Sequence, residues 1–205
     1  MSWLLAKIYD PFMRKTEESC LAEWRRSLLS PLSGEVLEIG AGTGVNLAHY
    51  GPDVQRLVVA EPDPHMRRSL SRRVAASSRA VELLDAGADA LPADAAAFDY
   101  VVSTLVLCSV PDLEAALGEI HRVLRPGGRL VFIEHVAAED RPERLAWQER
   151  LEPLWVRIAS GCHLTRRTDR AIEQAGFGIE AIVRQSVRKA LPFVRPSIRG
   201  VAVRP

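Results

Sequence analysis

Short apolar runs alternate with amphipathic stretches through the middle of the chain. The runs are rich in Val, Leu and Ile and lie at residues 36–39, 56–60, 81–84, 100–104 and 130–133. They are continuously apolar and do not alternate with polar positions, which is typical of parallel strands covered on both faces. We therefore expect five buried, parallel strands.

The segments between the runs have helical spacing or helix-boundary residues. Residues 4–29 predict a helix broken near Pro11, and residues 45–50 predict the start of another. Two further helices are predicted, at residues 64–76 and 113–124, and a turn at residues 126–128 follows the second of them. Strands that alternate with helices indicate crossover units and a doubly wound α/β sheet.

The pattern changes after residue 140. Residues 144–159 predict a helix interrupted at Pro153, and residues 168–175 predict one that ends at Gly176. Two closing strands at residues 179–187 and 198–203 predict an antiparallel pair. The expected organisation is a helical extension over residues 1–33 and a single α/β domain over residues 34–205.

A glycine-rich loop follows the first predicted strand and reads Glu38-Ile39-Gly40-Ala41-Gly42-Thr43-Gly44. Glycine lets the backbone approach a nucleotide-like ligand that a Cβ atom would block. A dinucleotide fingerprint would place its last glycine one position later, where this chain has Val45. No Gly-Lys-Ser/Thr ending follows, which excludes a phosphate-binding P-loop.

Acidic residues follow the next strands. Glu61 ends the second strand, where a carboxylate can accept hydrogen bonds from both hydroxyls of a ribose. Asp89 follows the third strand and either reaches an adenine edge or caps a loop. Asp99, before the fourth strand, is expected to be structural.

Composition narrows the class of partner. With 205 residues and a net charge of +1, the chain lacks the basic balance of a nucleic-acid-binding domain. Its three cysteines predict reduced thiols and a cytoplasmic location, and no apolar run is long enough for an integral membrane segment. After Glu180 the charged residues are all basic, which indicates either a solvated edge of the last strands or a weak patch for an anionic substrate or a membrane surface.

Together these residues resemble the class I S-adenosylmethionine-dependent methyltransferases. The matching motifs are residues 36–44, Glu61, residues 90–92, residues 99–102 and the Val-Leu-Arg-Pro-Gly-Gly stretch at residues 123–128. The resemblance implies a seven-stranded, mostly parallel sheet in the order 3-2-1-4-5-7-6 and S-adenosyl-L-methionine as cofactor. The residues it places at the cofactor are Glu38, Gly40, Ala41, Gly42, Thr43, Gly44, Asn46, Glu61, Pro62, Met66, Gly87, Ala88, Asp89, Thr104 and Leu105.

A narrower resemblance, to the thiol S-methyltransferases of animals, covers most of the chain. It rests on residues 104–110, 134–138, 147–148, 153–155, 161–166 and 195–200. It implies a small acceptor, with a thiol or sulfide as the leading candidate and a lipid, quinone or secondary metabolite as the alternative. A nicotinamide-dependent oxidoreductase fits the glycine spacing less well, and an inactive cofactor-binding partner subunit stays open.

Transfer to a thiol requires that the acceptor lose its proton, for which a histidine near neutral pKa is suited. His135 is the first candidate because it follows the fifth strand, at the edge where such sheets bind ligands. His163 is the second, and Cys108 follows the fourth strand as a pocket-lining or catalytic thiol. The five histidines are scattered and Cys162-His163 alone is no metal site, so no metal is expected.

Overall fold

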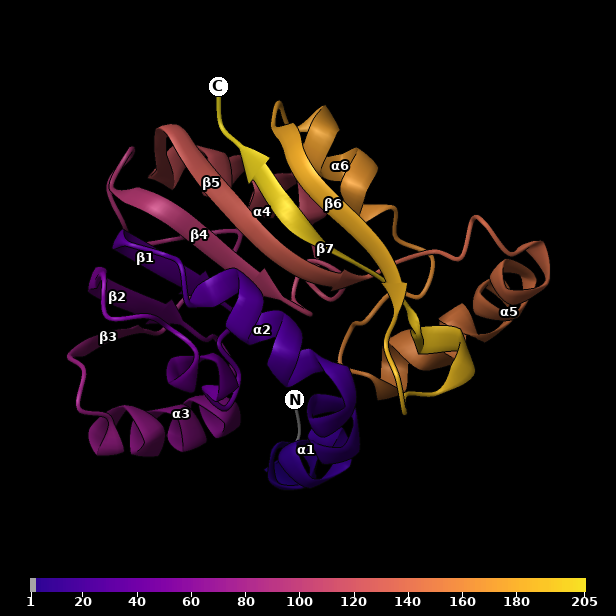
Figure 1. Cartoon of the computed structure of the whole chain (residues 1–205). Helices are drawn as coiled ribbons and strands as arrows, with labels where there is room; N and C mark the ends of the chain where they lie inside the picture. Colours follow the sequence, from indigo (N-terminus) through magenta and orange to yellow (C-terminus); the bar gives the residue numbers. More distant parts are fainter. Residues whose placement is uncertain (1–2) are drawn as a thin grey trace.

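The computed structural model describes the backbone of residues 3–205 and the side chains of residues 8–205. Within that part of the chain, strands form one sheet in the order β3-β2-β1-β4-β5-β7-β6 (Figure 1). The strands are β1 (Gly34–Ile39), β2 (Val54–Ala60), β3 (Val81–Leu84), β4 (Phe98–Thr104), β5 (Leu124–His135), β6 (Gly178–Ser186) and β7 (Pro196–Val203). Strands β1 to β5 pair in parallel, and β7 is antiparallel to both β5 and β6. The predicted fold class and strand order are confirmed.

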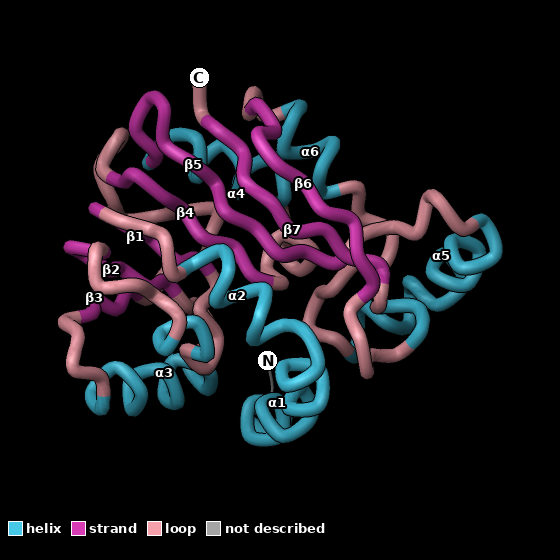
Figure 2. Tube along the Cα trace, in the orientation of Figure 1, coloured by secondary structure: helices cyan, strands magenta, loops and turns pink. Residues whose placement is uncertain are grey.

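Helices cover both faces of this sheet. They are α1 (Trp3–Thr16), α2 (Ala22–Leu29), α3 (Pro64–Ala76), α4 (Leu113–Val123), α5 (Pro142–Ile158) and α6 (Thr168–Gln174). A π-helical turn (Glu17–Leu21) joins α1 to α2. In Figure 2, α2 crosses the near face of the sheet, while α4 and α6 lie behind it. None of the helices in the described part of the chain is long and apolar enough to span a membrane.

Local chemistry sets where two of the crossover helices begin. The Asp63 side chain accepts hydrogen bonds from the backbone N–H groups of His65 and Met66 at the first turn of α3. Asp112 accepts the Ala115 N–H in the same way at the start of α4. Such caps satisfy N–H groups that have no partner within the helix.

Each face of the sheet has its own apolar layer. Leu117, Ile120 and Ile172 of α4 and α6 pack against one face, where Phe98 and Phe132 are almost completely buried. On the other face, Leu29 of α2 and Leu70 of α3 pack against a second set of strand side chains, which includes Val36, Leu57, Val102 and Val131. Because side chains alternate between the two faces of the sheet, each strand contributes residues to both cores, as the continuous apolar runs predicted.

Two predicted helix breaks are wrong. Helix α1 continues through Pro11, and α5 continues through Pro153. Both prolines lie on exposed helix faces, where water can satisfy the carbonyl group that proline leaves without a donor.

Two other boundaries also differ from the prediction. The helix expected after the glycine loop is only the 3₁₀ turn Val45–Ala48, which follows Gly44 in a left-handed conformation. The turn expected at residues 126–128 lies inside β5, where an irregular pairing with β4 and the left-handed Gly127 accommodate it.

Candidate active site

Most of the residues predicted to bind the cofactor gather at one edge of the sheet. The strands β3, β2, β1 and β4 are neighbours and parallel, so their carboxyl ends and the loops that follow lie side by side (Figure 1). These loops supply residues 40–44, 61–66, 86–89 and 104–108. Ligands of open parallel sheets bind at this edge.

The glycine loop has left-handed backbone at Gly40, Gly42 and Gly44, with φ of +55°, +58° and +85°. A Cβ atom on Gly40 would lie 2.6 Å from the Val106 side chain, and one on Gly44 would lie 2.7 Å from Leu70. At Gly42 the nearest atom would be a backbone oxygen 4.0 Å away. Protein packing therefore requires two of these glycines, whereas Gly42 faces open space that suits a ligand.

The Glu61 side chain is held at the mouth of this loop. Its two oxygens accept the backbone N–H groups of Gly42, at 2.7 Å, and Asp63, at 2.9 Å. Burial raises the pKa of this carboxyl group, against the effect of the two N–H donors. Each carboxylate oxygen keeps acceptor capacity for a further donor, such as a ribose hydroxyl.

Glu38 lies beneath the loop in a buried polar network. Its oxygens accept hydrogen bonds from the Asn46 amide at 3.0 Å and the Tyr50 hydroxyl at 2.7 Å. Asn46 accepts a hydrogen bond from Arg25, and Arg25 is paired with Glu17. Burial raises the pKa of Glu38 to about 7. Sequence reasoning placed Glu38 and Asn46 at the cofactor but missed Tyr50, Arg25 and Glu17, because no motif contains them.

The amino-terminal helices are joined to the loop by polar contacts. Thr43 donates a hydrogen bond to Asp10 of α1 at 2.7 Å, and Arg73 of α3 donates to both residues. Burial raises the pKa of Tyr9 to about 12, against the positive charge of Arg25, so its hydroxyl stays protonated near neutral pH. The helical extension thus contributes side chains to the site.

A second buried carboxylate shapes the loop after β4. Glu134 accepts the backbone N–H groups of Val106, Leu107 and Cys108 at 3.1 Å each, and the Ser103 hydroxyl at 2.7 Å. Its burial raises the pKa of the carboxyl group, and these four donors oppose the rise. The loop is thereby wrapped around Glu134, which fixes the position of Cys108.

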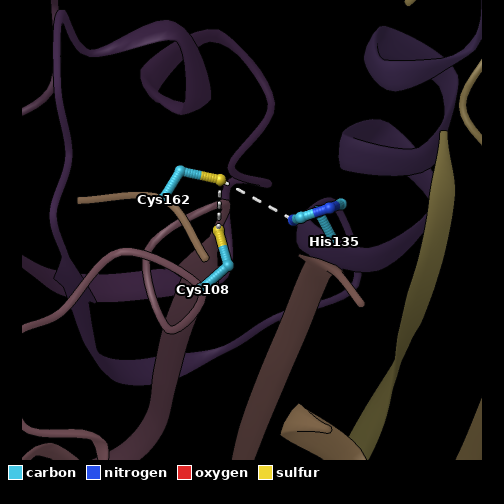
Figure 3. A group of neighbouring side chains, drawn as sticks. All are labelled: Cys108, His135 and Cys162. Atoms are coloured by element: carbon cyan, nitrogen blue, oxygen red, sulfur yellow. Dashed lines mark hydrogen bonds between the residues drawn. The ribbon is translucent and has the colours of Figure 1, made fainter. Parts of the chain in front are cut away.

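Two of the three predicted catalytic residues come together, with a third partner that the prediction had set aside. The Cys162 Sγ atom lies 3.9 Å from Cys108 Sγ and 3.7 Å from His135 Nδ1 (Figure 3). The contact between the two thiols lowers the pKa of Cys162, and the same contact together with burial raises the pKa of Cys108.

His163 is occupied elsewhere. Its Nδ1 atom lies 2.8 Å from Glu152, and its backbone N–H donates to the Cys108 carbonyl group. Its backbone therefore helps to position Cys108, while its imidazole pairs with a carboxylate of α5.

The remaining predicted residues have structural contacts of their own. Thr104 accepts a hydrogen bond from Asn46, and Leu105 has a left-handed φ of +59°. Met66 is buried, while Asp89 is exposed and turned back onto Gly87. Asp99 accepts the Glu35 N–H and pairs with Arg125, as expected of a structural residue.

Comparison with known proteins decides the family. Residues 37–132 match the model of a methyltransferase domain. Human thiol S-methyltransferase TMT1A is 35% identical over 218 residues, which cover 99% of this chain and 88% of that protein. Rat thiol S-methyltransferase TMT1B is 35% identical over 217 residues, covering 98% and 88%. The chain belongs to the class I S-adenosylmethionine-dependent methyltransferases.

Solved methyltransferase structures agree in fold. A methyltransferase of Bacillus halodurans superposes with a TM-score of 0.72 at 18% identity, covering 91% of this chain and 99% of that one. Geranyl diphosphate C-methyltransferase of Streptomyces coelicolor, solved with S-adenosyl-L-homocysteine, superposes with a TM-score of 0.69 at 17% identity, covering 92% and 81%. The cofactor of the present chain is S-adenosyl-L-methionine, whose sulfonium supplies an electrophilic methyl group. The open face at Gly42 and the Glu61 carboxylate beside it fit this molecule.

Proposed function

We propose that this methyltransferase methylates a small thiol. The observation that carries the proposal is the loop after β4, which reaches from the cofactor edge to a cluster of sulfur and imidazole groups. Its Val106 side chain lies against Gly40, and two residues later Cys108 lies beside Cys162. The similarity to two thiol S-methyltransferases over nearly the whole chain supports the same acceptor.

The cofactor residues proposed from the sequence keep their roles in this proposal. Gly42 and its neighbours lie along the amino-acid end of the cofactor, Glu61 accepts the ribose hydroxyls, and residues 62–66 and 87–89 flank the adenine. Because the sulfonium is already a good leaving group, these residues chiefly bind, orient and exclude water.

The acceptor must lose its proton as the methyl group moves. The thiol sulfur forms the new bond to carbon, the electron pair of the broken bond stays on the departing thioether, and the thiol proton goes to the protein or to water. We propose that His135 assists the loss of this proton. His163 is not proposed for this step, since its imidazole pairs with Glu152.

Replacement of His135 tests this role. We expect His135→Ala to slow turnover by about a hundredfold or more, with nearly unchanged affinity for S-adenosylhomocysteine. The matched variant His163→Ala should have a much smaller effect. Steady-state rates and calorimetry measure both quantities, and an unchanged rate in His135→Ala would remove the residue from the reaction.

Three acceptors with one carbon skeleton test the proposed substrate class. The protein is incubated with deuterium-labelled S-adenosylmethionine and an alkane thiol, the matching alcohol or the matching amine. Mass spectrometry should find the label in the thioether alone. Methylation of the alcohol or the amine in preference to the thiol would contradict the proposal, and transfer to none would favour an inactive cofactor-binding subunit.

We also propose a cytoplasmic, reducing location. It is supported by the three cysteines, all of which are free thiols although two of the sulfur atoms lie 3.9 Å apart. In an oxidising compartment this neighbouring pair would be prone to form a disulfide.

A weak contact with a membrane surface is proposed for α5. Its Trp147, Leu154 and Ile158 side chains are 55–59% exposed and follow helical spacing along one side. Sedimentation with anionic vesicles, compared between the natural chain and Leu154→Glu, tests this contact. Equal recovery of both in the pellet would contradict it.

A further inference from the structure

Cys108, His135 and Cys162 bring three metal-binding side chains together from three separate segments. Their donor atoms lie within 4.8 Å of one another at the carboxyl edge of the sheet, and Cys108 and His135 are buried while Cys162 is half-buried (Figure 3). We propose that these residues form a zinc site and that its open fourth position takes the acceptor thiol. The identity of the fourth ligand rests on the proposed function, whereas the site itself does not.

Two of the three distances between donor atoms fit a zinc ion, and the third, between Cys108 and His135, is below 4.8 Å. Zinc–sulfur bonds of about 2.3 Å and zinc–nitrogen bonds of about 2.0 Å at tetrahedral angles give edges of about 3.8 Å between sulfurs and about 3.5 Å between sulfur and nitrogen. The observed separations are 3.9 Å for the two sulfurs and 3.7 Å between Cys162 Sγ and His135 Nδ1. These contacts are too long for strong hydrogen bonds, and a disulfide requires sulfurs about 2.05 Å apart.

The backbone holds the two cysteine-bearing loops against each other. The N–H group of His163 donates to the Cys108 carbonyl group at 2.8 Å, directly after Cys162. Arg166 donates to the carbonyl groups of Leu107 and Val110 at 2.6 Å each. Both sulfurs are therefore positioned by contacts that do not involve their side chains, as a preorganised ligand set requires.

The imidazole of His135 otherwise lacks a strong partner. It is 4% exposed, its Nε2 atom has no hydrogen-bond partner among the described residues, and its Nδ1 atom has only the long contact with Cys162. A buried polar group without a partner is costly, so such groups call for a ligand or another explanation. A metal ion at Nδ1 would replace the long Cys162 contact with a strong bond, whereas the Nε2 atom would stay without a partner among the described residues.

The donor set favours zinc over other ions. Two cysteines and one histidine with a vacant fourth position are the ligands of a catalytic zinc site, and structural sites use four protein ligands. Thiolates also bind copper(I), so metal selectivity is an outcome of the test. Calcium and magnesium are disfavoured because they require oxygen ligands.

A metal-bound acceptor accounts for the removal of its proton. The acceptor thiol binds as a thiolate and releases its proton to water, since a coordinating thiol is deprotonated outright. Its sulfur then forms the bond to the methyl carbon, and the electron pair of the broken sulfonium bond remains on the departing thioether. The methylated product is a neutral thioether and a weaker ligand. His135 acts here as a ligand, and no redox change occurs.

Zinc titration of the natural chain tests the site without any measurement of activity. Chelator-treated protein is titrated with zinc chloride by calorimetry and then alkylated with and without the metal. We expect one zinc ion per chain and at least tenfold slower alkylation of Cys108 and Cys162. Cys20, which is buried elsewhere, serves as the internal control and should alkylate equally in both samples. Absence of zinc binding, or binding of copper(I) alone, would overturn the assignment.

Matched variants locate the metal. Cys162→Ser should bind zinc at least a hundredfold more weakly, while Cys20→Ser should bind it like the natural chain. Equal zinc affinity in Cys162→Ser would overturn the proposal. Cys162 is half-buried and lies outside the apolar core clusters, so Cys162→Ser should fold. Cys20 belongs to one of these clusters, so circular dichroism must verify that both variants are folded before their zinc affinities are compared.

The cobalt-loaded protein tests the fourth position. Addition of an alkane thiol should shift the thiolate-to-cobalt absorption, and the matching alcohol should leave it unchanged; no shift with the thiol would refute the fourth-ligand assignment. Metal-free protein that methylates thiols at the full rate would overturn the zinc proposal and leave the proposed function intact. Protein that binds zinc but methylates no thiol would overturn the proposed function and leave the zinc site intact.

Discussion

Glu61 shows how one carboxylate can serve both the loop and the ligand. It accepts the N–H groups of Gly42 and Asp63 in the free protein and has lone pairs left for a ribose. We expect Glu61→Gln to weaken S-adenosylhomocysteine binding by about tenfold or more, because hydrogen bonds to a charged group contribute about 1.5–3 kcal/mol. Calorimetry measures this, with Glu82→Gln on the exposed edge as control. Equal affinity in Glu61→Gln would exclude the ribose contact.

Glu38 predicts a pH dependence of stability. Because burial raises its pKa from 4.5 to about 7, the folded protein keeps a proton that the unfolded chain releases between these values. Its stabilising contribution is complete below pH 4.5 and is lost as the pH rises through about 7. Its size is about 3 kcal/mol.

Urea unfolding between pH 4 and 8 checks this contribution. Glu38→Gln, which cannot titrate, should show a smaller loss of unfolding free energy over that range than the natural chain. Parallel pH profiles of the two proteins would contradict the assigned burial effect.

At the scale of elements, a comparison of two glycines separates the effect of backbone strain on stability from the effect of an added side chain on ligand binding. Gly42 and Gly127 both have left-handed φ, +58° and +78°, and neither has an atom closer than 4.0 Å to where a Cβ would lie. Alanine at either position should therefore destabilise the fold by a similar amount, about 1–2 kcal/mol. Only Gly42→Ala should also weaken S-adenosylhomocysteine binding. Thermal unfolding and calorimetry separate the two effects, and equal cofactor affinity in both variants would show that Gly42 does not face the ligand.

The helices and strands also show how much of the structure can be predicted from the sequence. Apolar runs and caps predict β1 to β5, α3 and α4, because burial and local hydrogen bonds determine them. The Glu38 network could not be predicted, because Arg25 and Tyr50 join it through tertiary contacts and belong to no sequence motif. The sequence does not indicate that Cys162 contacts His135. This contact depends on how residues 161–166 fold back on the loop after β4.

At the scale of the whole molecule, the amino-terminal helices pack as part of the methyltransferase core. Leu21 is completely buried in a cluster with Trp24, Ile133 and Val187, so it connects the extension to β5. We expect Leu21→Ala to lower the free energy of unfolding by about 3 kcal/mol in a single transition. Phe12→Ala, at a residue 68% exposed, should have little effect. A separate early transition in Leu21→Ala would show that the extension unfolds independently.

Cofactor binding at the carboxyl edge of the sheet is tested most directly by titrating the full chain with S-adenosylhomocysteine and with NAD under the same conditions. One S-adenosylhomocysteine molecule should bind per chain, with no detectable binding of NAD. Binding of NAD in preference, or no binding of S-adenosylhomocysteine to folded protein, would contradict the assignment of this edge as the cofactor site.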